Sequence, residues 1–122
     1  MDGLIAFPTH APGGFDASLS AHFASCACFT LVEIGDRGAI GATVLPTPAI
    51  DDGSGAERVQ RLAQHGVRAV VVSSISGQAL AELQQAGIAV WRDQSQRRVA
   101  ALVEAMKRGQ IPQLGPRLAH DS

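Results

Sequence analysis

Three side chains in the first quarter of the chain are suited to binding soft metals. They belong to His22, Cys26 and Cys28. Imidazole nitrogen and thiolate sulfur suit copper, iron–sulfur and related thiophilic centres better than magnesium or calcium. The two thiols alone cannot complete a tetrahedral zinc site, because one residue separates them and the chain has no other cysteine. We therefore expect these three residues to form part of a metal site, with Cys26 a better candidate than Cys28.

His22 and Cys28 also have interpretations without a metal. His22 fits a loop histidine that only makes a hydrogen bond. Cys28 begins a β-branched and aromatic run, where a free cysteine packs as a small hydrophobic residue. A disulfide between Cys26 and Cys28 is not expected, because neighbours this close on a strand have poor geometry for one.

Two segments rich in glycine and serine come immediately before predicted helices. The first contains Gly53, Ser54 and Gly55, and the second covers residues 73–77. Backbone N–H groups and the helix dipole favour anions at such positions. The alternative for the first segment is a turn in which Ser54 caps the helix. The first segment lacks the Gly-Lys-Ser/Thr of a P-loop and the third glycine of a dinucleotide fingerprint, so neither nucleotide motif is predicted.

The hydrophobic pattern predicts one α/β domain that positions these residues. Apolar and β-branched runs predict five strands, and apolar positions three and four residues apart predict three helices. The long helical connections favour parallel pairing of the last two strands, and the short turn after residue 34 favours an antiparallel hairpin. We expect a five-stranded mixed sheet of order 3-2-1-4-5, a ribonuclease-H-like motif. The expected strands are 4–7, 28–34, 39–45, 67–72 and 88–91; the helices are 56–65, 78–86 and 95–108. Residues 1–109 form the expected domain and 110–122 a flexible tail.

Chain direction in this topology brings the chemically useful residues to one edge of the sheet. The connections that leave strands 1 and 4 diverge there, which is the condition for a ligand crevice in an open sheet. We expect the following residues at this edge: His10, His22, Cys26, Cys28, Gly53, Ser54, Gly55, Ser73, Ser74, Ser76, Gly77 and Arg92.

Composition narrows the classes of function. Ten basic residues against 11 acidic ones give a net charge of -1, which provides no broad positive field for nucleic-acid phosphates. The longest apolar run is far short of a membrane span, and the first residues lack the basic segment of a secretory signal. We expect a soluble, cytoplasmic protein without a nucleic-acid or membrane partner. A two-metal nuclease would need clustered carboxylates, and Glu33 is the only acidic residue in the first two strands.

Several segments resemble the dinitrogenase iron-molybdenum cofactor biosynthesis family, over about residues 4–108. The family includes nitrogenase cofactor carriers of the NifX and NafY type, the C-terminal domain of NifB and a molybdenum–copper orange protein of sulfate reducers. The most specific element is His22-Phe23 with the strand that follows. This chain departs from the family pattern at Ala24, at Cys28 and at residues 76–78. The matching segments are 5–7, 19–23 with 29–33, 53–58, 62–67, 79–80 and 87–88.

The resemblance implies a domain that binds anionic metal–sulfur clusters. The histidine that matches His22 is implicated in cluster binding in some members, and Cys26 falls where other members also carry cysteine. We therefore expect a non-enzymatic carrier of a molybdenum–copper or iron–molybdenum sulfide cluster, with other cluster-assembly proteins as further partners. The expected cluster-binding residues are His22, Cys26, Gly53, Ser54, Gly55, Ser74, Ser76, Gly77 and Arg92, and the expected direct metal ligands are His22, Cys26 and Cys28. A protein interaction module without a cofactor is the main alternative, and a hydrolase is a weaker one.

Overall fold

The computed structural model describes residues 3–23, 26–35, 38–46 and 56–114 of the chain. A mixed six-stranded sheet has the order β3-β2-β1-β4-β5-β6. The pairs β1–β2, β2–β3 and β5–β6 are antiparallel, and β1–β4 and β4–β5 are parallel. The strands are β1 (Gly3–Thr9), β2 (Cys28–Gly35), β3 (Gly38–Pro46), β4 (Val67–Val72), β5 (Ala89–Arg92) and β6 (Gln113–Leu114); the helices are α1 (Ala56–Gln64), α2 (Gly77–Gln85) and α3 (Val99–Lys107).

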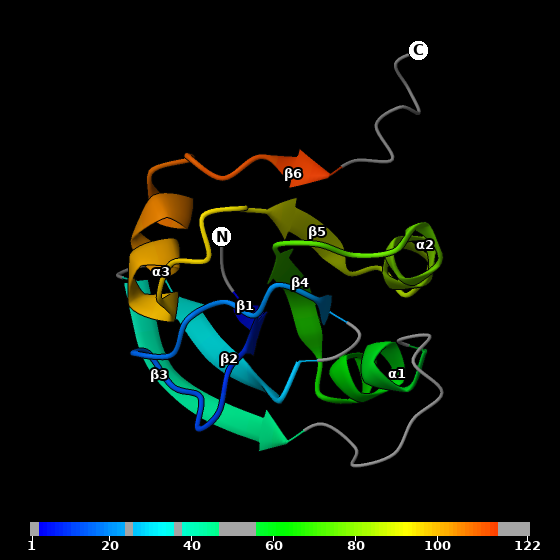
Figure 1. The fold of residues 1–122 in the computed structure, drawn as a ribbon, viewed down its shortest axis with the longest axis horizontal. Coiled ribbons are helices and arrows are strands. Elements are labelled where there is room, and N and C mark those ends of the chain that lie inside the picture. The colour runs from blue at the N-terminus through cyan, green and yellow to red at the C-terminus, as the bar shows by residue number, and fades with distance from the viewer. Residues whose placement is uncertain (1–2, 24–25, 36–37, 47–55, 115–122) are drawn as a thin grey trace.

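Helices cover both faces of the sheet (Figure 1). The helices α1 and α2 lie on one face and α3 lies on the other. One apolar cluster lies beneath α1 and α2 and includes Phe29, Leu62 and Leu83, while the second lies beneath α3 and includes Phe7, Val32 and Leu102. Because successive strand residues point to opposite faces, each central strand supplies both clusters. The nearly continuous burial of β1 and β4 follows from this arrangement.

The predicted fold class, helix number and strand order 3-2-1-4-5 are confirmed, and the structure adds a sixth strand. β6 lies within the segment that the sequence analysis assigned to a flexible tail. Pro112 O accepts a hydrogen bond from Arg92 N at 3.0 Å, and Ile111 is buried against the α3 side of the core. Residues 110–114 therefore pack on the domain, whereas residues 115–122 lie outside the described part of the chain.

The third helix is shorter than predicted. It begins at Val99 rather than at residue 95, so Arg97 and Arg98, which the predicted helix included, precede it. Val99 N donates to Ala17 O at 2.9 Å and Ala100 N donates to Phe15 O at 3.0 Å. These loop carbonyls take the place of a side-chain cap, which satisfies N–H groups that have no partner within the helix. The start of α3 is thus determined by a segment about 80 residues earlier in the chain.

Within the described ranges, no helix is long and apolar enough to cross a bilayer.

Candidate functional site

The carboxyl ends of three strands and the start of β2 meet at one edge of the sheet. Thr9, at the end of β1, pairs with Cys28, at the start of β2. Val72, at the end of β4, pairs in parallel with Arg92, at the end of β5. Since β1 and β4 are parallel neighbours, these four positions lie at the same edge, which we call the ligand edge. Its location is the switch point predicted from the sequence.

Hydrogen bonds join the loops at the ligand edge into one surface. Phe23 N donates to Ser74 O at 3.1 Å, which ties the segment before β2 to the loop after β4. Arg92 Nε donates to Ser73 O at 3.3 Å, which ties the end of β5 to the same loop. The loop of residues 73–76 is therefore held from two sides, and Ser73 is buried while Ser74 is exposed.

His22 is exposed at this surface and directly precedes the buried Phe23. The ring of Phe23 lies 5.6 Å from the ring of Phe29, centroid to centroid, inside the core beneath α1 and α2. Ser20 Oγ donates to His22 O at 3.5 Å, a contact that uses the backbone and leaves the imidazole uninvolved. The buried neighbour therefore fixes the backbone, while the imidazole faces solvent where a ligand can reach it.

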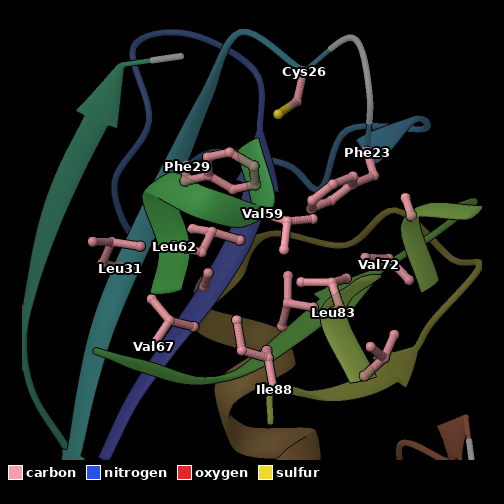
Figure 2. Close-up of a cluster of buried hydrophobic side chains, with 14 of the residues drawn as sticks. Phe23, Cys26, Phe29, Leu31, Val59, Leu62, Val67, Val72, Leu83 and Ile88 are labelled. Atoms are coloured by element: carbon pink, nitrogen blue, oxygen red, sulfur yellow. The ribbon is translucent and has the colours of Figure 1, made fainter. Parts of the chain in front are cut away.

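Cys26 is only 2% exposed and belongs to the apolar cluster beneath α1 and α2. Figure 2 shows its side chain above Phe29 and Phe23, with the sulfur directed inward. Arg58, in the first turn of α1, donates from Nη2 to Cys26 O at 3.2 Å. The thiol therefore lies on the core side of the ligand edge, and His22 lies on its exposed side.

Burial raises the pKa of the Cys26 thiol above its ordinary value, although the hydrogen bond and positive charge of Arg58 act in the opposite direction. Desolvation disfavours the charged thiolate, and here it outweighs the neighbouring cation. Cys26 is therefore a neutral thiol near pH 7 in this structure. Binding of a soft metal would replace the thiol proton, which is released to water, by a sulfur–metal bond.

Cys28 has different surroundings although it is only two residues away. It lies on the face of the sheet that carries Thr30 and Val32, opposite the cluster that contains Cys26. Its Sγ lies 3.4 Å from Thr9 Oγ1, and Thr9 Oγ1 lies 3.0 Å from Thr30 Oγ1. The thiol donates to the carbonyls of Thr9 and His10 at 3.8 and 3.7 Å. Cys28 thus belongs to a buried polar group that anchors the loop after β1.

The structure does not gather the three predicted metal ligands into one cluster. Among the described residues, no three histidine, cysteine or acidic side chains are close enough together to hold a metal ion. His10 is exposed in the loop that Cys28 anchors. A single metal ion needs several protein ligands close together. A multinuclear cluster brings its own sulfide ligands, so fewer protein ligands can hold it.

The start of α2 supplies the anion-favouring part of the ligand edge. Ser76 Oγ accepts a hydrogen bond from Ala79 N at 3.1 Å and caps the helix. Gly77 and Gln78, whose N–H groups precede this capped position, are both exposed. Arg92 is also exposed and adds a positive charge at the adjacent strand end. Gly53, Ser54 and Gly55, predicted to play the same part at the start of α1, lie outside the described residues.

Comparison with known protein families assigns the chain, including the ligand edge, to one family. The sequence model of the dinitrogenase iron-molybdenum cofactor family matches residues 3–109. The chain belongs to this family. The matched range covers all three helices and the strands β1 to β5, so it contains every described residue of the ligand edge. No curated protein matches the chain.

Solved structures share this fold along nearly their whole length. The apo form of the orange protein from Desulfovibrio gigas is 25% identical, with a TM-score of 0.83 over 94% of this chain and 95% of that one. A Thermotoga protein described as a NifB protein is 25% identical, with a TM-score of 0.74 over 93% and 94% of the two chains. A protein from Methanocaldococcus jannaschii described as a dinitrogenase is 16% identical, with a TM-score of 0.74 over 94% and 97%, and shows the common fold.

One residue of the site in this family member was not among the sequence-based candidates. Arg58 is only 5% exposed and contacts the backbone of Cys26. A signal was available, because Arg58 precedes Leu62 by four residues and so falls on the apolar stripe of α1. A cation on the buried face of an amphipathic helix requires polar partners, and the structure supplies one of them at the ligand edge.

Proposed function

We propose that this protein is a non-enzymatic carrier of an anionic, molybdenum-containing metal–sulfur cluster. The observation that supports it most is the meeting of soft-ligand and anion-binding groups at one edge of the sheet. An exposed imidazole and a buried thiol lie there with the start of α2 and the guanidinium of Arg92. Membership in the dinitrogenase iron-molybdenum cofactor family agrees with this class of cargo.

The cluster is a multiply charged anion, so charge complementarity contributes to its retention. In this proposal, the backbone N–H group of Gly77 and the hydroxyls of Ser74 and Ser76 face the cluster together with Arg92. The proposal also includes Gly53, Ser54 and Gly55, which were predicted from the sequence as anion-binding residues and lie outside the described residues. Charge-assisted hydrogen bonds are stronger than neutral ones, so several of them can hold an anion without a covalent bond to every metal.

Direct ligation is assigned to His22 and Cys26. The exposed imidazole of His22 is accessible to an incoming cluster, and the buried thiol of Cys26 would bind the cluster from the core side. Cys28, predicted as a third ligand, has a different role in this proposal, because its sulfur is directed to Thr9 on the other face of the sheet. It keeps the loop after β1 in position.

Two cargoes fit this chemistry. An iron–molybdenum cofactor precursor would depend on His22 as an imidazole ligand, whereas a molybdenum–copper sulfide cluster held by charge would depend less on any one side chain. We favour the molybdenum–copper cluster, because the chain forms one small domain and matches the orange protein over 95% of that protein's length. Metal analysis of the protein isolated from its native source distinguishes the two cargoes.

Anaerobic reconstitution tests the proposal. The protein is incubated with tetrathiomolybdate plus copper or iron and then desalted. Charge-transfer absorption and stoichiometric metal should remain with the protein, and its unfolding temperature should rise because the ligand binds the native state. Absence of retained metal, with an unchanged unfolding temperature, would contradict a carrier and support an interaction module without a cofactor.

A further inference from the structure

Arg58 has an unusual position for an arginine. It is 5% exposed in the first turn of α1, and Val59, the next residue, is part of the apolar core. Arginine is rarely buried to this extent unless its charge and N–H groups are engaged, because removing a guanidinium from water is costly. Its charge and N–H groups therefore need polar partners inside the domain.

The guanidinium joins α1 to the segment before β2, on the core side of the ligand edge. Its Nη2 donates to Cys26 O at 3.2 Å, a buried contact between residues 32 positions apart. It therefore connects the first turn of α1 to the segment immediately before β2. The hydrogen bond and positive charge of the same side chain also act to lower the pKa of the Cys26 thiol, against the effect of burial.

We propose that Arg58 is a positioning residue that holds Cys26 in place for the cluster. The inference rests on the proposed function, because it concerns the thiol assigned there as a ligand. Groups that hydrogen-bond to a metal ligand orient it and tune the metal, and their removal typically lowers metal affinity by about 10- to 100-fold. A guanidinium also offsets the negative charge that a metal-bound sulfur carries, which an apolar side chain at residue 58 would not do.

The inference is tested first in the apo protein, by the rate at which the Cys26 thiol reacts with a maleimide. A Cys28→Ala background leaves Cys26 as the only cysteine. In that background, Arg58→Gln should increase the labelling rate severalfold, because the thiol, only 2% exposed in the parent, is released from its buried position. Loss of the cation alone would disfavour the thiolate and slow the reaction, so faster labelling reports this release. Arg58→Lys keeps the positive charge and a hydrogen-bond donor, so its labelling rate should lie between those of the parent and Arg58→Gln. Arg61→Gln, on the same helix and without a contact to Cys26 among the described residues, is the matched control and should label like its parent.

The second measurement is cluster retention, with both cysteines present. After reconstitution with tetrathiomolybdate and copper, Arg58→Gln should retain less metal than the parent and show a shifted charge-transfer band, and Arg58→Lys should restore part of both. Apo proteins of equal urea stability exclude a general loss of structure. If Arg58→Gln does not fold, Arg58→Lys decides, because it must still label faster than Arg61→Gln.

Equal labelling rates for the folded Arg58 variants and Arg61→Gln would overturn the inference, as would full cluster retention with an unshifted band in Arg58→Gln. A parent that retains no cluster contradicts the proposed function instead. In that case, the labelling rates of the apo proteins still decide whether Arg58 positions Cys26.

Discussion

The two thiols show how different the surroundings of residues two positions apart can be. Cys26 precedes β2 and points into the core beneath α1 and α2, whereas Cys28 is part of β2 and points to the other face. Replacement of each by serine should separate their roles. Cys26→Ser should reduce cluster retention, because sulfur is lost at the ligand edge.

Cys28→Ser should retain the cluster and lower stability by about 1 kcal/mol, a small cost for a buried hydroxyl because the carbonyls of Thr9 and His10 can accept its hydrogen bond. Metal content after desalting and urea unfolding measure the two effects. Equal loss of metal in both variants would contradict the separation of roles.

The histidine at the ligand edge gives a second residue-level prediction. His22→Ala should reduce the metal retained after reconstitution and change the free energy of unfolding by less than about 0.5 kcal/mol, since an exposed loop side chain contributes little to the core. His65→Ala is the control, because His65 is also exposed but precedes β4 at the opposite edge of the sheet. If both His22→Ala and Cys26→Ser retain full metal, binding rests on loop amides and helix starts rather than on ligation.

The pKa of Cys26 predicts how stability depends on pH. Burial raises the pKa of the folded thiol above its ordinary value of 9.0, so the native state holds the proton after the unfolded chain has lost it. This contribution to stability is present below about pH 9 and is lost as pH rises towards and through the folded pKa. Urea unfolding of the apo protein between pH 8 and 10.5 should therefore show a steeper loss of stability for the parent than for Cys26→Ala. Parallel profiles of stability against pH for the parent and Cys26→Ala would contradict a raised pKa of this thiol.

At the scale of elements, the start of α2 has two roles that substitutions can separate. Ser76 caps the helix through Ala79 N, so Ser76→Ala should lower stability by about 1 kcal/mol. Aspartate also caps helices well, but it adds a negative charge where the cluster is proposed to bind. Ser76→Asp should therefore keep the stability of the parent and retain less metal. Full retention by Ser76→Asp would show that the start of α2 does not face the cluster.

The starts and ends of elements were the hardest features to predict. The spacing of Val99, Leu102 and Met106 predicted a third helix, but not that carbonyls of Ala17 and Phe15 would cap it at Val99. The helical pattern itself arises from neighbours three and four residues apart, whereas that cap comes from a distant loop.

At the scale of the whole molecule, residues 110–114 complete one edge of the sheet. They lie beyond the part that matches the family, yet Ile111 is 2% exposed against the α3 side of the core. Ile111→Ala should lower the free energy of unfolding by about 2 kcal/mol or more, as for other large apolar residues in cores. Urea unfolding measures the change, with Gln113→Ala, an exposed position, as the control. A change below about 0.5 kcal/mol, the usual range for surface substitutions, would show that this segment does not support the domain.

Local patterning was sufficient to predict the α/β class, the strand order and the edge at which His22, Ser76 and Arg92 lie. Hydrophobic periodicity and glycine breaks depend on residues close together in the chain, and chain direction follows from general rules of connection. Both can therefore be read from a single sequence. The tertiary structure decided what local patterning leaves open. It separated Cys26 from Cys28 by placing their sulfurs on opposite faces of the sheet, and it brought Arg58 from α1 to Cys26. Those outcomes depend on which distant side chains share a buried volume, and packing in three dimensions determines that.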